Sequence, residues 1–237
     1  MENWSGIINV LQVGARSSFL EYNSLYTSVN NNAYYSDNWR YQDTAGASYY
    51  RQNGGEHVFF VAPSGTADAV ISFTQAMTIN SSGIITAPVQ PAFLAYVSST
   101  ISDVTGDATV YTVIFNAEVF DQAGNFNTGT GVFTAPVTGK YRLSCSVDIR
   151  GLVAANNNFQ LHLATSNRSY GSIFDVPAGA NPFVPNRNMT VNALCDMDAG
   201  DTASIVLYIA GGSKVADIYG SGGSTGMYSY FCGELVS

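Results

Sequence analysis

The stretch GVFTAPVTGKYRLSCSV, residues 131–147, determines the fold of the second half of this chain. In its last seven residues, 141–147, apolar and polar side chains alternate. A period of two is typical of a β-strand that buries one face and leaves the other wetter. The side chains expected to point into the core are Tyr141, Leu143, Cys145 and Val147, and those expected to point outward are Arg142, Ser144 and Ser146.

The same stretch also predicts how the strand begins. Pro136 cannot donate to a β-ladder, so we expect one strand to end there. Gly139 can adopt a positive φ, which favours a tight turn before the next strand. We therefore expect Phe133 and Tyr141 to return on neighbouring strands.

The rest of the chain has the same texture. Runs of four to eight β-branched or aromatic residues alternate with turn clusters, which predicts an all-β protein with at most one short helix at residues 6–13. Pro88 and Pro91 mark a domain junction. Before it, strands are expected at 39–42, 47–52, 56–62, 69–73 and 75–79. After it, ten strands of a two-sheet jelly-roll sandwich are expected at 92–98, 110–116, 131–135, 140–149, 158–164, 171–175, 188–197, 202–210, 214–219 and 227–236.

Composition excludes several function classes. Apolar residues make up 46% of the chain, charged residues only 11%, and the net charge is −8, without a basic cluster that could hold a phosphate backbone. We expect no nucleic-acid partner. Residues 1–14 lack the positively charged start and the apolar run of seven or more residues that a secretory signal has. No apolar run in the chain is long enough for a membrane helix. Three widely spaced cysteines without a Cys-x-x-Cys pair predict buried thiols, with no metal and no cofactor: Cys145, Cys195 and Cys232.

Residues 91–237 resemble the complement globular-head and tumour necrosis factor superfamily. The resemblance lies in AFLAYVSS (92–99), IFN (114–116), FTAPVTGKY (133–141), DAGDTASIVLY (198–208) and YSYFCGELV (228–236). Cys232 and Glu234 depart from its closing strand. The resemblance implies a homotrimer of ten-stranded antiparallel jelly rolls that recognises ligands through apical loops or through grooves between subunits.

Residues 30–87 resemble a segment common in bacteriophage tail-fibre proteins, with AMTINSSG (76–83) as the matching unit. Its strands look too brief to be stable alone, since isolated hairpins are marginal in water, and Tyr34, Tyr35, Tyr49 and Tyr50 look exposed. We therefore expect an N-terminal attachment segment at 1–29, a trimeric fibre-like β segment at 30–90 and the jelly roll at 91–237.

Nothing in the sequence predicts catalysis. GGSTG at 222–226 fits Gly-x-Ser-x-Gly, but a strand is expected after it and both histidines precede Ser224. His162 is expected on a polar strand face. DMDAGD (196–201), with Asp196, Asp198 and Asp201, is interpreted as a charged β-turn rather than a calcium site. We expect no enzyme, no catalytic residue and no metal ligand.

Binding residues are expected in uncharged loops, whose Asn, Arg and Tyr side chains can hydrogen-bond and stack on sugars. Solvated turns or subunit contacts are the alternative for each of them. Four tyrosines, Tyr208, Tyr219, Tyr228 and Tyr230, are instead expected to line the core or the subunit interface. The candidate receptor-binding residues are Asn156, Asn157, Asn158, Asn167, Arg168, Tyr170, Asn181, Phe183 and Arg187.

Together these features predict a homotrimeric phage virion fibre or distal tail adhesin that binds a bacterial surface glycan or protein. It would be made in the host cytoplasm and joined to other virion structural proteins through residues 1–29. Because about thirty residues precede the fibre-like segment, the alternative is a structural head fibre or capsid decoration protein that binds no receptor.

Overall fold

The computed structural model describes residues 9–13, 18–22, 26–176, 185–222 and 226–236, with side chains from residue 27 onward. The chain divides into two compact units, residues 1–89 and 90–237, which are described separately below. Every regular element among the described residues is a strand, in line with the predicted all-β class. Residues 9–13 form a strand where a short helix was expected, and residues 6–8 lie outside the described part. No described helix could cross a membrane.

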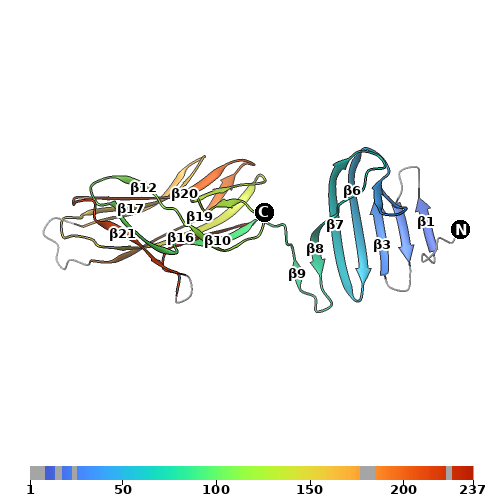
Figure 1. The fold of residues 1–237 in the computed structure, drawn as a ribbon, viewed down its shortest axis with the longest axis horizontal. Helices are drawn as coiled ribbons and strands as arrows, with labels where there is room; N and C mark the ends of the chain where they lie inside the picture. Colours follow the sequence, from blue (N-terminus) through green and yellow to red (C-terminus); the bar gives the residue numbers. More distant parts are fainter. Residues whose placement is uncertain (1–8, 14–17, 23–25, 177–184, 223–225, 237) are drawn as a thin grey trace. The chain divides into compact units, whose positions relative to one another are not determined.

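The first unit is a seven-stranded antiparallel sheet with a small hairpin, β4–β5, beside it (Figure 1). Its strand order, β1-β2-β3-β6-β7-β8-β9, follows the chain apart from that hairpin. Gly54 and Gly55, both with positive φ, make the turn between β6 and β7, where a side chain would strain the backbone. The strands are β1 (Asn9–Val13), β2 (Ser18–Tyr22), β3 (Tyr26–Asn31), β4 (Ala33–Tyr35), β5 (Trp39–Tyr41), β6 (Ala45–Asn53), β7 (Glu56–Gly65), β8 (Thr74–Ile79) and β9 (Ile85–Thr86).

Two expectations for this unit are wrong. Its strands are not all brief, because β6 has 9 residues and β7 has 10, and the strands pair within one chain. Backbone pairing therefore needs no second copy. Residues 69–73 form no strand; Val70 makes only an isolated bridge to Arg40.

One face of this sheet carries a small core. Ala47 and Ala62 pack with Ala33 and Tyr41 of the hairpin and with Ile71. Tyr49, expected to be exposed, is buried; its ring lies 5.2 Å from Trp39 and 5.4 Å from Phe60. Three of the five buried residues of this cluster are alanines. Because alanine side chains are small, this core alone buries little apolar area.

The opposite face of the sheet carries a row of partly exposed apolar side chains among polar ones. Register places Val29 beside Tyr50, Tyr50 beside Phe59, and Phe59 beside Met77. The Tyr50 and Phe59 rings stack 4.7 Å apart, and Val29 keeps 43% of its surface exposed. We call Val29, Tyr50, Phe59 and Met77 the apolar row.

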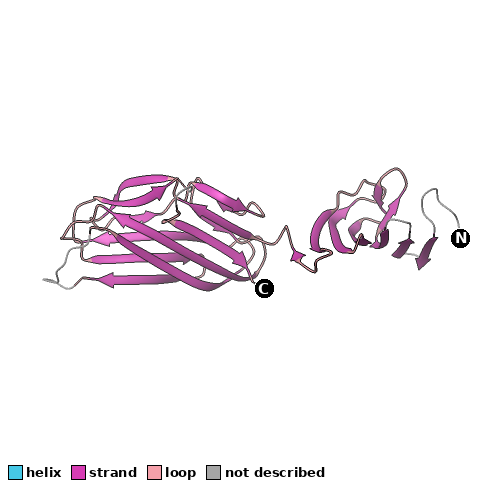
Figure 2. Cartoon of the chain, turned by 90° about the horizontal axis from the view of Figure 1, so that it is seen from below, coloured by secondary structure: helices cyan, strands magenta, loops and turns pink. Residues whose placement is uncertain are grey.

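The second unit is a sandwich of two antiparallel sheets, which confirms the predicted jelly roll (Figures 1 and 2). One sheet has the order β11-β21-β16-β22-β10-β13, with β19 on the other side of β16; the second has the order β14-β15-β20-β17-β18, with β12 beside β20. The strands are β10 (Ala92–Tyr96), β11 (Ser99–Thr105), β12 (Val110–Thr112), β13 (Ala117–Asp121), β14 (Phe126–Asn127), β15 (Val132–Thr134), β16 (Gly139–Arg150), β17 (Asn158–Thr165), β18 (Ser169–Asp175), β19 (Arg187–Met197), β20 (Thr202–Ala210), β21 (Ala216–Ser221) and β22 (Tyr230–Leu235).

The described part of the second unit has three more strands than the ten that the sequence predicts: β11, β13 and β14. The expected strand at 110–116 ends at Thr112, and β11, β13 and β14 lie where loops were expected. β11, β13 and β14 pair with β21, β10 and β15, and this pairing, which their local sequences do not reveal, stabilises them.

The residues between β15 and β16 transfer the chain from one sheet to the other. Phe133 belongs to the six-stranded sheet and Tyr141 to the seven-stranded one, so the expectation of neighbouring strands is wrong. The two rings meet across the core, 5.5 Å apart, and the Tyr141 hydroxyl donates to the Val137 carbonyl. Gly139 has no positive φ; it is the first residue of β16 and pairs with Met197.

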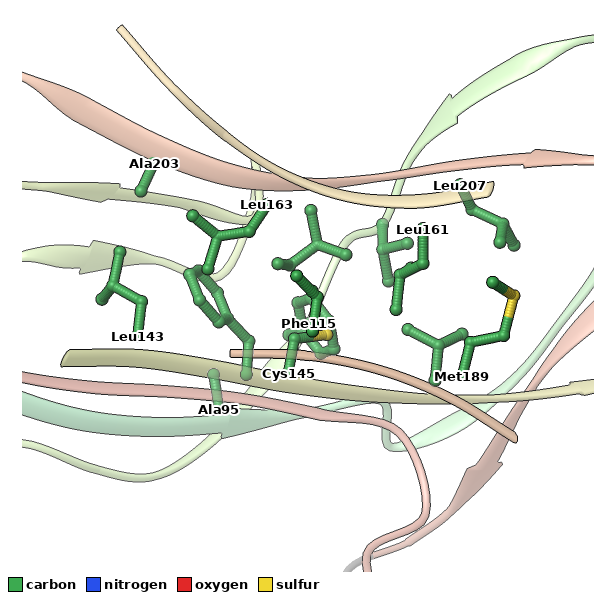
Figure 3. Close-up of a cluster of buried hydrophobic side chains, with 14 of the residues drawn as sticks. Ala95, Phe115, Leu143, Cys145, Leu161, Leu163, Met189, Ala203 and Leu207 are labelled. Carbon is green, nitrogen blue, oxygen red and sulfur yellow. The ribbon is translucent and has the colours of Figure 1, made fainter. Parts of the chain in front are cut away.

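The core of the second unit lies between its two sheets. Figure 3 shows Leu161, Leu163, Ala203 and Leu207 of one sheet facing Ala95, Leu143, Cys145 and Met189 of the other. The predicted inward residues 141, 143, 145 and 147 are all buried. Ser146 departs from the pattern: it is buried on the outward face, where its hydroxyl donates to the Tyr228 carbonyl.

All three thiols are free. Cys145 and Cys195 are buried and Cys232 is half-buried, which confirms the prediction for the first two. Burial raises the pKa of each thiol above its ordinary value, and the neighbouring Cys232 adds to the rise at Cys145. The thiols are therefore protonated near neutral pH and serve as small apolar side chains.

Candidate ligand-binding surfaces of the jelly roll

The candidate binding residues lie at two opposite ends of the sandwich. Ala92 pairs with Glu234, and Gly139 pairs with Met197, so the beginning and the end of this unit lie at the same end, which we call the near end. Ile149 pairs with both Arg187 and Ile218 at the other end, which we call the far end. The loops that carry the candidate residues therefore form two separate surfaces.

Asn156, at the far end, is a structural residue. Its side chain is 5% exposed; its Oδ1 accepts from the Val153 amide at 2.9 Å, and its Nδ2 donates to the Gly106 carbonyl at 3.2 Å. The amide thus joins the loop after β16 to the loop after β11. In this position Asn156 cannot present its polar atoms to a receptor.

The next two asparagines differ in exposure. Asn157 is exposed, while its backbone accepts from Val176 at 2.7 Å and donates to Ala210 at 3.0 Å. The Asn158 side chain is half-buried: it donates to the Asp175 carboxylate and accepts from Gln160 at 2.9 Å. Among these three asparagines, it is Asn157 whose backbone is held by hydrogen bonds while its side-chain amide is exposed.

Replacing Asn156 with alanine should lower the free energy of unfolding by about 1–3 kcal/mol, because a buried amide and a buried carbonyl lose their partner. Asn157→Ala is the matched control, with an expected change within about 0.5 kcal/mol. Urea unfolding followed by near-ultraviolet circular dichroism measures both. Equal effects of the two variants would contradict the structural role of Asn156.

Arg187 lies at the far end between two aromatic rings. Its guanidinium carbon is 3.9 Å from the ring centre of Phe174 and 4.8 Å from that of Phe159. The cation thus joins β18 of one sheet to β19 of the other by cation–π contacts. Asn181 and Phe183 lie outside the described residues.

The residues of the turn after β17 lie at the near end, opposite Asn156, Asn157 and Asn158. Asn167 donates to the Asp201 carboxylate at 2.8 Å, and Arg168 forms an exposed ion pair with Asp196 at 2.7 Å. Tyr170 packs against the core edge, where burial, followed by the nearby Cys195 thiol, raises its pKa. Exposed pairs of this kind contribute about 0–1 kcal/mol, so they orient the turn more than they stabilise the fold.

The acidic segment forms the predicted charged turn. The Asp201 amide donates to the Asp198 carbonyl at 2.9 Å, and the Asp198 amide donates to the Asp201 carboxylate at 2.8 Å. Within the described ranges, no three His, Cys, Asp or Glu side chains gather as a possible metal site. His162 lies on the polar side of β17 as predicted, 3.1 Å from Gln160 and 3.2 Å from Ser169. Residues 223–225 of GGSTG lie outside the described part.

Sequence reasoning missed an aromatic cluster at the far end. The Arg150 guanidinium lies 3.2 Å from the ring centre of Tyr219 and pairs with Asp148 at 3.0 Å. Tyr219 in turn contacts Tyr228, with ring centres 5.7 Å apart. None of the four tyrosines expected in the core or interface is buried, and Tyr228 is 47% exposed. The sequence could not reveal this cluster, because Arg150 and Tyr228 are far apart in the chain.

The outward face of the seven-stranded sheet carries a second unassigned surface. Its apolar members are Leu94 and Tyr96 on β10 and Tyr230 on β22, and register places Tyr96 beside Tyr230. Arg142 and Glu234 form an exposed ion pair at 3.1 Å on the same face. We call Leu94, Tyr96 and Tyr230 the sheet face.

Apolar side chains are also exposed on the strands at the side of the sandwich where both sheets end: Ile173 and Phe174 on β18, and Leu194 on β19, where it lies beside Arg142 on the outward face of the seven-stranded sheet. β18 and β19 are edge strands of the two sheets. The exposed fractions are 60% for Ile173, 44% for Phe174 and 59% for Leu194. We call Ile173, Phe174 and Leu194 the sandwich edge.

Comparison with known proteins agrees with this architecture. Residues 92–236 match the family described as C1q domain. Among solved structures, the globular domain of the zebrafish complement 1qA protein is similar at 18% identity, covering 62% of this chain and 98% of that chain, with a TM-score of 0.37. Murine APRIL is similar at 11% identity (62% and 99% coverage, TM-score 0.42), and the Eiger TNF of S. frugiperda at 12% identity (63% and 92% coverage, TM-score 0.41). No curated protein matches the chain.

Proposed function

This chain belongs to the C1q domain family, and from this premise we propose that it is a homotrimeric binding protein of a phage virion fibre, with the C1q domain as its receptor-binding head. Domains of this family are often trimeric and bind ligands. The observation that carries the proposal is the joining of such a domain to a β unit whose sheet exposes an apolar row. The resemblance of residues 30–87 to tail-fibre segments supports the virion location.

The C1q domain offers two different apolar surfaces for self-association, the sheet face and the sandwich edge. When the two contacting surfaces of identical copies differ, the contact is head-to-tail and closes into a ring if the rotation allows. The sheet face contributes half-buried Leu94 and Tyr96, and the sandwich edge contributes Leu194. Three copies joined edge to face would cover both surfaces on each copy.

Trimerisation would also cover the apolar row of the first unit. A single-layer sheet must bury its apolar face against another layer, and the small core of this unit covers only the other face. Three such units attached to one trimeric head experience a high effective concentration of one another. Each row of Val29, Tyr50, Phe59 and Met77 would then be covered by a second copy.

Receptor contact is proposed at the far end, around Asn157 and the Arg150–Tyr219–Tyr228 cluster. Asn157 offers an amide that can donate and accept, and Tyr228 offers an exposed aromatic ring. Such contacts suit a bacterial surface glycan or a polar protein loop. Three weak sites on one head would gain avidity without any single tight contact.

Three measurements test the proposal. Size-exclusion chromatography with light scattering should give three times the chain mass of 25.2 kDa, and a stable monomer would refute the trimer. Labelled protein should bind a subset of a panel of bacterial strains. Binding should be lost in the double variant Asn157→Ala/Tyr228→Ala and kept in Thr130→Ala.

Antibody labelling at the tail tip of intact particles supports adhesion, whereas labelling of the capsid supports a decoration protein.

A further inference from the structure

A polar hollow lies at the near end of the C1q domain, away from the proposed receptor surface. Gln122, in the loop just before it, donates its backbone amide to the Ala92 carbonyl at 2.9 Å, which places this loop beside the start of β10. The hollow has a volume of about 430 Å³, within the range of about 300–1,000 Å³ typical of small-molecule sites. It is lined by Gly124, Asn125, Phe126, Asn127, Thr128 and Thr134.

The backbone around this hollow is held in place. The Asp121 carboxylate accepts from the Phe126 amide at 2.8 Å, and Thr134 donates its amide to the Asn125 carbonyl at 2.9 Å. The Asn127 Oδ1 accepts from the Gly129 amide at 2.9 Å and so fixes the turn before β15. A ligand would therefore meet a preformed wall, which reduces the ordering cost of binding.

One group in the wall lacks a partner. The Asn125 Nδ2 is buried and has no hydrogen-bond acceptor among the described residues. Buried donors in folded proteins are nearly always paired, so an unpaired one needs an explanation. Asn125 is one of the residues that line the hollow, and the terminal torsion of asparagine is broad, so rotation about it can redirect this amide.

The chemistry of the lining selects the ligand class. Its side chains are two amides, two hydroxyls and one phenyl ring, with no charged group, so an ionised ligand would find no counter-charge. Phe126 is 7% exposed and stacks on Phe93 at 4.9 Å, so little apolar surface remains for a hydrocarbon ligand. Hydroxyls and amides both donate and accept, which matches a molecule with many hydroxyl groups.

We propose that this hollow binds a neutral sugar ring, with Asn125 donating to a ligand oxygen and Thr128 and Thr134 exchanging hydrogen bonds with ligand hydroxyls. The site does not depend on the proposed function, because it lies at the opposite end of the domain from Asn157 and Tyr228. It would give each copy of the chain a second saccharide contact.

Saturation-transfer NMR on the full chain tests the site, with galactose, rhamnose and N-acetylglucosamine as soluble probes and a printed array of neutral glycans as the second arm. At least one probe should receive saturation from the wild-type protein. Asn125→Ala removes the unpaired amide but keeps the backbone pairing to Thr134, and should weaken binding by about tenfold, the value of one hydrogen bond. Thr134→Arg, an exposed position, should fill the hollow and abolish binding.

Thr130→Arg is the matched control, since Thr130 is exposed on the same turn but does not line the hollow, and it should bind like wild type. Circular dichroism verifies that each variant is folded. If an arginine variant does not fold, Asn125→Ala still tests the site. The proposal is overturned if none of the sugars receives saturation, or if Asn125→Ala and Thr134→Arg bind like wild type. Loss of binding only in Asn157→Ala would overturn the hollow and leave the proposed receptor surface standing.

Discussion

Replacing Phe93 with alanine should lower the free energy of unfolding of the C1q domain by about 3–5 kcal/mol. Its side chain is 1% exposed, and its ring lies 4.9 Å from both Phe126 and Phe133 and 5.0 Å from Phe231. These contacts reach from β10 in one sheet to β14 and β15 in the other. Truncation would leave a cavity where the two sheets meet, and the surrounding rings could collapse only partly into it.

Guanidinium unfolding, monitored by near-ultraviolet circular dichroism, measures this loss. Phe120→Ala is the matched control: it removes the same atoms from the neighbouring strand β13, but Phe120 is 46% exposed, so about 1 kcal/mol or less should be lost. Because domains of this size have only about 5–15 kcal/mol of stability, Phe93→Ala should also reduce the yield of folded protein. A loss for Phe93→Ala no larger than that for Phe120→Ala would show that the rings do not support the sandwich as described.

Leu194→Arg should convert the trimer into monomers. Leu194 is 59% exposed on the sandwich edge, and in the proposed ring its side chain is covered by the sheet face of the next copy. An arginine there would have to be desolvated at each of the three contacts, which is unfavourable. Light scattering should then give the mass of one chain, 25.2 kDa, with an unchanged circular dichroism spectrum.

Val110→Arg provides the control for this variant. Val110 is 65% exposed, like Leu194, but belongs to β12, which pairs with β20 of the six-stranded sheet and lies outside both proposed contact surfaces. This variant should remain trimeric. If Leu194→Arg stayed trimeric as well, the edge-to-face arrangement would be wrong even though the chain trimerises.

Much of the strand pattern could be predicted because it is local. Residues 141–147 alternate in sequence and alternate in burial, apart from Ser146, since a strand places successive side chains on opposite faces. Ser146 fails because the loop segment at Tyr228, distant in sequence, covers the outward face at that point. Likewise, glycine can adopt a positive φ, but the connection at Gly139 does not require one, and Gly139 does not adopt it.

The binding surfaces were less predictable for the same reason. Asn156, Asn157 and Asn158 are identical and adjacent, yet one is buried, one is exposed and one is paired with a carboxylate. Gly106 and Asp175, which make the difference, come from other loops and strands. The cluster at Arg150 had no local sequence signal, because Arg150, Tyr219 and Tyr228 are far apart in the chain. The hollow beside Asn125 is lined by residues 124–128 and 134, and its shape depends on how β14 folds back on β15.

By itself, the sequence determined the all-β class, the division near Pro88 and Pro91 and the membership of residues 92–236 in a jelly-roll family, because periodicity, turn residues and motif order are properties of neighbouring residues. Only the tertiary structure decided that Phe133 and Tyr141 lie in opposite sheets, that Asn156 and Arg168 lie at opposite ends, and that the first unit pairs its own strands. Those outcomes depend on which distant strands hydrogen-bond to one another, and the alternation of a single strand carries no information about its partner.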